Sequence, residues 1–163
     1  MARRGLARLL TPPLFLLQPV LARIVRVIAA ENPSMFNRLG PWVGKDFLID
    51  PVNMPFALLL RPDPVAPVLR AVSRHAPPPH VAHISGRFLD LLELVDADLD
   101  GDALFFSRAL TIRGNTEAVV SLRNAMDDID GSVAARVADM FGPPGRLALA
   151  ALRRASKAPK RRE

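Results

Sequence analysis

The chain has 163 residues, of which 50% are apolar and 23% are charged, with sixteen prolines and no cysteine. This length is typical of a single domain with a sizeable core. The lack of cysteine excludes disulfides, thiolate metal sites, iron–sulfur clusters held by the chain's own thiolates and cysteine nucleophiles. It gives no sign of an oxidising compartment, so we expect a cytoplasmic protein.

The formal net charge of +6 is concentrated at the two ends of the chain. Residues 1–30 carry +5 and residues 146–163 carry +6, whereas residues 31–145 carry −5. Basic ends on an acidic body favour contact with an anionic membrane surface. Only one aromatic residue, Phe15, lies in the basic ends, so base stacking is poorly supported and we expect no specific nucleic-acid partner. RNA binding through the basic tail stays open as an alternative.

The apolar N-terminal segment, residues 14–30, is interrupted by Gln18, Pro19 and two arginines. A membrane-spanning helix needs about 20 apolar residues without central charges, so this segment is not expected to span a bilayer. A signal peptide is a competing interpretation, but Pro19 breaks the apolar run and the pattern continues beyond any cleavage point. Apolar residues at helical spacing instead predict a basic amphipathic helix for residues 1–31. Its expected membrane contacts are Arg3, Arg4, Arg8, Arg23 and Arg26.

Strands and helices alternate through the first part of the remaining chain. Turn residues at 32–33 and 40–41 bracket a short turn at 35–39, and Pro77–Pro79 form a rigid connector. The patterns predict a hairpin of strands at 47–50 and 54–60, a helix at 63–74, a strand at 80–85 and a helix at 87–95.

The second part of the chain is predicted to be mainly helical. We expect a short helix at 104–106, a strand through Leu110 and Ile112 that Gly114 ends, and a long helix capped by Thr116. Further helices are expected at 132–141 and 146–155, with a turn at 142–145 between them. The fold class is therefore α+β, with a small, mainly antiparallel sheet covered by helices on one face.

Two clusters suggest metal binding, and each has a simpler explanation. Asp96 to Gly101 match the first six positions of a calcium loop, but Ser107 stands where the bidentate glutamate should be. We therefore interpret them as an exposed acidic turn. His75, His80 and His83 lie within nine residues, but His80 and His83 are expected on opposite faces of a strand. Surface histidines are the favoured interpretation, and no metal site is predicted.

Candidate catalytic motifs are almost absent. No serine lies in a Gly-x-Ser-x-Gly elbow, and there is no glycine-rich phosphate loop. Acid–base chemistry by Asp127, Asp128 and Asp130 stays open, although solvation at a helix end explains these carboxylates. We expect neither an enzyme nor a cofactor. A chain rich in apolar residues but poor in catalytic groups suits an apolar ligand, although the same residues also fill an ordinary core.

One stretch resembles a known family. Residues 105–117 read FFSRALTIRGNTE and resemble the last strand and following helix of the sterol-carrier-protein lipid-binding domain, where F-F-x-x-x-L-x-I-x-G-[DN] recurs. Residues 123–129, RNAMDDI, are similar to the UbiT-type branch, the accessory factors of ubiquinone biosynthesis. The looser resemblance covers about residues 15–130. Asn115 departs from the commoner aspartate, and His83 stands near a family aspartate or threonine.

The resemblance implies an α+β domain at 32–145 that encloses a hydrophobic tunnel, followed by a basic helix and tail at 146–163. It also implies a non-catalytic accessory factor of oxygen-independent ubiquinone biosynthesis, peripheral at the inner membrane face. The implied cargo is an isoprenoid quinone intermediate or a phospholipid, and the implied partners are UbiU- and UbiV-like hydroxylation proteins, which hold the iron–sulfur clusters. The alternative is a membrane-tethered scaffold without lipid cargo.

The resemblance also suggests which side chains line the tunnel, although each of them can equally belong to a plain core. The expected lipid-binding residues are Phe56, Leu58, Leu60, Phe106, Leu110, Ile112, Val119, Leu122 and Met126. The polar members of the motif are Arg108, a candidate partner of a lipid head group or of a helix carboxylate, and Asn124, a candidate backbone cap.

Overall fold

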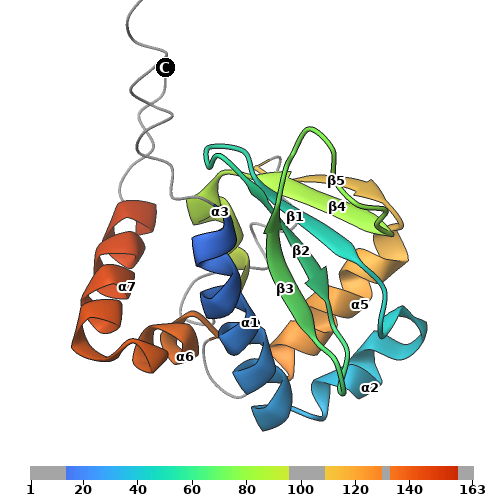
Figure 1. Cartoon of the computed structure of the whole chain (residues 1–163), viewed down its shortest axis with the longest axis horizontal. Helices are drawn as coiled ribbons and strands as arrows, with labels where there is room; N and C mark the ends of the chain where they lie inside the picture. The colour runs from blue at the N-terminus through green and yellow to red at the C-terminus, as the bar shows by residue number, and fades with distance from the viewer. Residues whose placement is uncertain (1–13, 96–108, 130–132, 158–163) are drawn as a thin grey trace, which may run out of the picture.

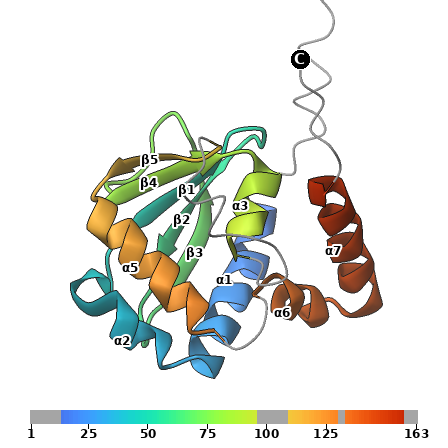
Figure 2. The ribbon, with the colours of Figure 1, turned by 180° about the vertical axis from the view of Figure 1, so that it is seen from behind.

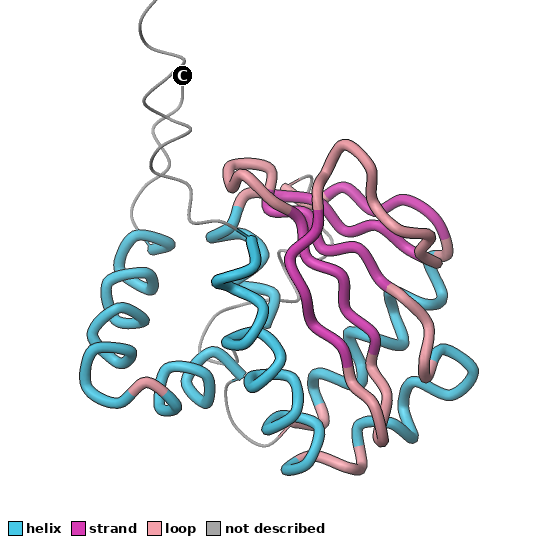
Figure 3. Tube along the Cα trace, in the orientation of Figure 1, coloured by secondary structure: helices cyan, strands magenta, loops and turns pink. Residues whose placement is uncertain are grey.

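The structure is a computed structural model that describes residues 14–95, 109–129 and 133–157 (Figures 1 and 3). In chain order its elements are α1 (Leu14–Glu31), α2 (Met35–Leu39), the 3-10 helix η1 (Gly40–Trp42), β1 (Phe47–Pro51), β2 (Ala57–Arg61), β3 (Val68–Val72), β4 (Ala82–Gly86), α3 (Phe88–Val95), β5 (Thr111–Gly114), α5 (Thr116–Asp127), α6 (Val133–Met140) and α7 (Gly142–Lys157). The helix expected at 104–106, the calcium-like loop, Phe106, Arg108, Arg3, Arg4 and Arg8 lie outside the described residues.

The five strands form one mixed sheet in the order β3-β2-β1-β4-β5. The predicted hairpin of β1 and β2 is confirmed, with Phe47 opposite Leu60, and β3 and β5 extend the sheet with antiparallel pairs. The single parallel pair joins β1 to β4, with Phe47 opposite Ala82. The predicted α+β class with a mainly antiparallel sheet is therefore confirmed.

The two faces of the sheet carry different side chains because neighbouring residues of a strand point to opposite sides. One face supplies Phe47, Ala82 and Ile84 to the main core, where they meet Val119 and Leu122 of α5. Helices α2 and α5 lie behind the sheet in Figure 1 and in front of it in Figure 2. On the other face, a smaller buried cluster consists of Leu48, Ala57, Leu59 and Val72.

Helix α1 packs along β3, a strand at the edge of the sheet. The side-chain amide of Gln18 donates to the carbonyl oxygen of Ala71 at 2.9 Å, and the Ala71 N–H donates to Gln18 Oε1 at 3.1 Å. A strand edge presents backbone groups that need partners. The polar residue that interrupts the apolar run of α1 therefore pairs with the backbone at this edge.

The helix predicted at 63–74 is wrong, because the segment contains a turn followed by strand β3. The carboxylate of Asp63 accepts hydrogen bonds from the N–H groups of Ala66 and Val65, at 2.9 and 2.8 Å, which hold the pKa of Asp63 below its usual value. Pro67 then disfavours a helix interior, and β3 pairs with β2 over five residues. Val65, counted in the helical pattern, is 90% exposed.

Three other predicted boundaries differ from the structure. Strand β2 begins at Ala57 rather than at residue 54, because a turn occupies the preceding residues. The cap of α5 is Asn115 rather than Thr116, since the Asn115 side chain accepts a hydrogen bond from the Ala118 N–H at 3.0 Å. Residues 142–145 are the first turn of α7, where prolines are tolerated because those N–H groups need no helical partner.

Candidate functional site

A cavity of about 570 Å³ lies between the sheet and the helices. Closed voids in protein interiors are seldom larger than a water molecule, and this space is far larger. Its volume lies within the roughly 300–1,000 Å³ that is usual for small-molecule sites. The structure thus provides room for a ligand in the place where a core would otherwise be packed.

The sheet and three helices supply most of the cavity wall. The sheet contributes side chains from one face of β1, β2, β3 and β4, including Ile49, Leu58, Leu60, Leu69 and Ile84. Helix α1 contributes Ile24, Val25 and Ile28, helix α3 contributes Phe88, Leu91 and Leu92, and helix α5 contributes Val119, Leu122 and Met126. An aliphatic and aromatic wall of this kind binds hydrocarbon and offers hydrogen-bond partners to few polar groups.

Helices α6 and α7 pack against each other at a large angle and complete the wall on the side of α3 (Figures 1 and 2). Leu149 of α7 is buried against Ala134 and Ala138 of α6, and Leu92 of α3 packs on this group. Arg136 of α6 donates to the carboxylate of Glu31 at the end of α1, at 2.8 Å. Phe141 lines the cavity while 45% exposed, so the cavity reaches the surface beside this pair.

Five of the predicted lipid-binding residues are brought together in the cavity wall: Leu58, Leu60, Val119, Leu122 and Met126. Leu58 and Leu60 share a face of β2, and strand alternation places both side chains on the side of the cavity.

Three other predicted residues do not line the cavity. Phe56 precedes β2 in the turn, so strand alternation does not apply to it. Leu110 and Ile112 pack in the main core beside β4, at the far edge of the sheet. Of the two polar motif members, Asn124 is exposed on α5 and Arg108 is outside the described residues.

The described part of the predicted membrane-contact set lies on the outer side of α1. Arg23 and Arg26 are exposed, and the apolar residues Phe15, Leu16 and Val20 near the start of the same helix are 70%, 56% and 40% exposed. The guanidinium of Arg26 also donates to the carbonyl oxygen of Ala22 at 3.1 Å. Within the described ranges, no helix combines the length and the apolar character needed to cross a bilayer.

Sequence reasoning missed two parts of the site. It assigned α6 and α7 no role in the cavity, although Val133, Val137, Leu149 and Leu152 line it. It also missed Arg123, which lines the cavity and pairs through Nη1 with Asp127. Arg123 is four residues after Val119 and three before Met126, so helical periodicity places it on the same apolar stripe. That spacing was the signal that could have identified it.

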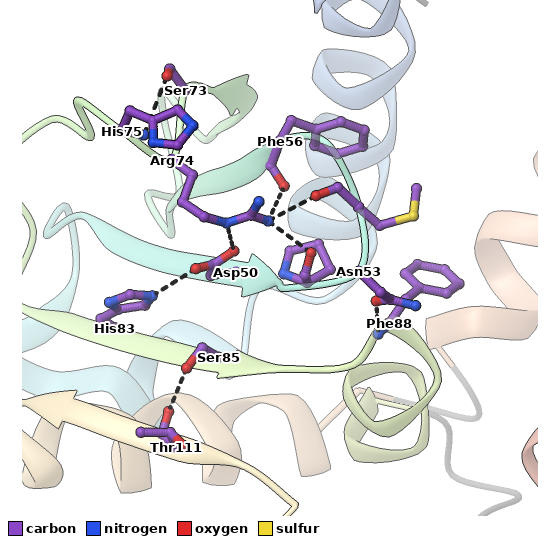
Figure 4. Close-up of polar contacts among 12 residues, drawn as sticks. Asp50, Asn53, Phe56, Ser73, Arg74, His75, His83, Ser85, Phe88 and Thr111 are labelled. Atoms are coloured by element: carbon purple, nitrogen blue, oxygen red, sulfur yellow. Dashed lines mark hydrogen bonds and ion pairs between the residues drawn. The ribbon is translucent and has the colours of Figure 1, made fainter. Parts of the chain in front are cut away.

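A polar cluster occupies the opposite face of the sheet (Figure 4). Buried Asp50 accepts from Arg74 Nε at 2.6 Å, and His83 Nε2 lies 3.3 Å from its other oxygen. The predicted opposite orientation of His80 and His83 is wrong, because His80 precedes β4 and the two rings meet edge to face at 5.8 Å. In the parts of the chain that the structure describes, no three histidine or carboxylate side chains form a metal-binding group.

Comparison with known proteins connects this architecture to a family. Residues 26–127 match the SCP-2 sterol transfer family, whose domains are generally non-catalytic lipid carriers. No curated protein matches the sequence. A solved structure described as UbiJ-SCP2, a ubiquinone synthesis protein, is 14% identical, with a TM-score of 0.56, and the alignment covers 72% of this chain and 93% of that one.

A second structure, sterol carrier protein 2 from Yarrowia lipolytica in its apo form, is 11% identical, with a TM-score of 0.43. That alignment covers 69% of this chain and 88% of the other. The matched family region runs from within α1 to the end of α5, which leaves α6 and α7 outside it. The match spans more than half of the chain and carries the strands and helices that form most of the cavity wall. The chain therefore belongs to the SCP-2 sterol transfer family.

Proposed function

We propose that this protein binds an isoprenoid quinone intermediate or a phospholipid in the cavity and is a non-catalytic, UbiT-like accessory factor of oxygen-independent ubiquinone biosynthesis. In this role it presents its cargo to UbiU- and UbiV-like hydroxylation proteins. The observation that carries the proposal is the cavity of about 570 Å³ with its apolar wall. Membership of the SCP-2 sterol transfer family and the sequence motif at 105–129 support it.

The physical basis is the cost of exposing a hydrocarbon tail to water. Burial of apolar surface is favourable by about 25 cal/mol per Å², or about 0.8 kcal/mol for each CH₂ group. A long isoprenoid or acyl chain therefore stays in the bilayer unless a protein offers an equally apolar environment. The side chains of α1, α3, α5 and the sheet offer such an environment, and their few polar atoms fit a ligand segment that makes no hydrogen bonds.

The proposed location is the cytoplasmic face of the inner membrane. Helix α1 has two sides that suit this location, because Ile24 and Ile28 line the cavity while Phe15, Leu16 and Arg23 are exposed. An exposed apolar start followed by basic residues is the pattern of a helix that lies on an anionic bilayer surface. The same helix then borders both the membrane and the cavity, which gives a lipid a short route between them.

The test uses full-length protein and a pair of arginine substitutions on α5. Met126 lines the cavity, whereas Val120 on the same helix is 40% exposed and outside the wall. We expect native mass spectrometry of the wild type and Val120→Arg to show one bound lipid after incubation with liposomes that contain a polyprenylated quinone precursor. Met126→Arg should lose this adduct, because a charged group in an apolar cavity is strongly unfavourable.

A wild-type protein that is purified empty and takes up neither the quinone precursor nor phospholipid from liposomes would overturn the carrier function. A scaffold for biosynthetic enzymes would then be the function to test, by co-purification of the hydroxylation proteins with the wild type and Met126→Arg. Deletion of residues 146–163 does not separate the two functions, because Leu149 and Leu152 belong to the cavity wall.

A further inference from the structure

Arg123 is the one charged side chain in the cavity wall that the described residues form. It lies on α5 between Leu122 and the turn that carries Met126, and both of these side chains also line the cavity. An ordinary core would place leucine or methionine at such a position, because a charge in apolar surroundings is costly unless it is paired. Packing alone therefore does not explain a charged side chain at this position.

The two side chains of the Arg123–Asp127 ion pair differ in how much of each is exposed to solvent. The Arg123 side chain is 15% exposed, whereas its partner Asp127, one helical turn further on, is 56% exposed. Asp127 lies at the last position of α5 and is not part of the cavity wall. The carboxylate can therefore turn into solvent, where it is well hydrated, while the guanidinium stays at the wall.

We infer that Arg123 is the specificity-determining residue of this cavity and binds the anionic head group, a carboxylate or a phosphate, of an amphipathic ligand whose tail fills the apolar space. This inference rests on the proposed lipid-binding function. Guanidinium groups bind carboxylate and phosphate through parallel N–H donors, and such charge-assisted hydrogen bonds are stronger than neutral ones. Asp127 neutralises Arg123 when no ligand is present, and the head group takes over that role when one enters.

Binding of the head group by Arg123 predicts that anionic ligands bind more tightly than a neutral ligand with the same tail. A neutral ligand gains only the apolar wall and leaves the Arg123–Asp127 pair unchanged. An anionic ligand with the same tail gains hydrogen bonds to a charged donor, which are individually stronger than neutral ones. We expect the wild type to prefer oleate and oleyl phosphate to oleyl alcohol by at least about tenfold. Comparison of oleate with oleyl phosphate then identifies which anionic head the site prefers.

The experiment measures displacement of the neutral dye phenylnaphthylamine from the full-length, delipidated protein by each of these three ligands. The buffer is mildly alkaline, so that the carboxylic acid is ionised. Arg123→Met keeps an aliphatic side chain in the wall and should lose the preference for the two anionic ligands, because the cation that pairs with their head groups is gone. Arg113→Met is the matched control, because Arg113 is exposed on β5 and outside the wall, and it should keep the wild-type preference.

Asp127→Asn gives a second test that keeps Arg123 in place, and it applies even if Arg123→Met does not fold. Removal of the competing carboxylate should raise the preference for the anionic ligands by at least about threefold, since the guanidinium then has one anionic partner fewer. An unchanged or reduced preference in Asp127→Asn would overturn the assignment, as would a wild type that binds all three ligands equally.

Failure of the inference differs from failure of the proposed function. If neither the wild type nor Arg123→Met distinguishes oleate from oleyl alcohol, Arg123 does not bind the head group, but the cavity still binds lipid. If the wild type binds neither the dye nor any of the three ligands, the lipid-binding function itself is wrong.

Discussion

Arg74 organises the turn between β1 and β2 from a distant position in the sequence. Its Nε donates to Asp50, and its Nη2 donates to the carbonyl oxygens of Pro51 and Met54 at 2.9 Å each (Figure 4). Asn53, in the same turn, accepts a hydrogen bond from the N–H of Phe88 at the start of α3. Pro51 and Phe88 both line the cavity, so the turn to which Arg74 donates also adjoins part of the cavity wall.

Replacement of Arg74 by methionine should lower the free energy of unfolding by about 3 kcal/mol, because it leaves the buried Asp50 carboxylate without its cationic partner. Guanidinium chloride unfolding measures this change. Arg70→Met, on the exposed side of β3 and four residues before Arg74, should change the stability by less than about 0.5 kcal/mol.

A double-mutant cycle checks that the buried charge is the cause. Asp50→Asn in the Arg74→Met background should recover part of the loss, since the amide is easier to bury than an unpaired carboxylate. If the double variant is as unstable as Arg74→Met or less stable, the loss comes from the turn carbonyls and not from the charge.

Leu58, Leu60 and Phe56 show what the sequence can and cannot predict about the cavity wall. Leu58 and Leu60 were found because alternation along a strand is a local property. The turn that excludes Phe56 from β2 depends on Arg74, eighteen positions away in the sequence, which donates to the Phe56 carbonyl oxygen at 3.2 Å. Contacts between distant segments of this kind are not encoded in the local spacing of apolar residues.

At the level of elements, the α6–α7 pair depends on one glycine. An added Cβ at Gly145 would lie 2.9 Å from the Phe141 side chain and closer still to the carbonyl oxygen of Ala138. The first turn of α7 can therefore approach α6 only when residue 145 has no side chain. This close approach brings Ala148 and Leu149 to the cavity wall.

Gly145→Ala tests this steric requirement against helix propensity. In an ordinary helix the substitution stabilises by up to about 1 kcal/mol. Here we expect the opposite, with faster amide hydrogen exchange across residues 133–157 and a several-fold weaker affinity for bound lipid. Ala150→Val, on the exposed side of α7, is the control and should leave both quantities close to wild type. Slower exchange in Gly145→Ala would show that the two helices do not need this contact.

Elements also differ in how well the sequence predicted them. The long helix α5 and the hairpin of β1 and β2 were found from periodicity and turn residues. Strand β3 was not, because Val68, Leu69 and Val72 fit both a helical stripe and a half-buried strand. The segment forms a strand because it pairs with β2 and packs against α1. Both of these are contacts with other elements, which local spacing does not reveal.

At the scale of the whole molecule, the basic residues of α1 favour a defined orientation on an anionic surface. Each arginine near such a surface contributes about 1 kcal/mol. Replacement of both Arg23 and Arg26 by glutamine should therefore weaken binding to vesicles of phosphatidylcholine with phosphatidylglycerol by roughly 30-fold. Co-sedimentation with these vesicles, and with vesicles of phosphatidylcholine alone, measures the effect, which added salt should diminish.

The matched control replaces Arg70 and Arg113, two exposed arginines on the sheet, by glutamine. This variant should bind vesicles as the wild type does, because its net charge changes equally while α1 is intact. Equal weakening in both double variants would show that net charge, and not the surface of α1, attracts the protein to the bilayer.

The pairing of Gln18 with Ala71 limits how α1 can move. If the helix left the domain to enter a bilayer, it would uncover a strand edge against which a second copy of the chain could align, and self-association would compete with lipid transfer. A helix that keeps its inner side on β3 and contacts the membrane only through Phe15, Leu16 and Arg23 avoids this hazard. The two hydrogen bonds of one glutamine side chain thus favour a position of α1 that keeps this strand edge covered, which the proposed work beside a membrane requires.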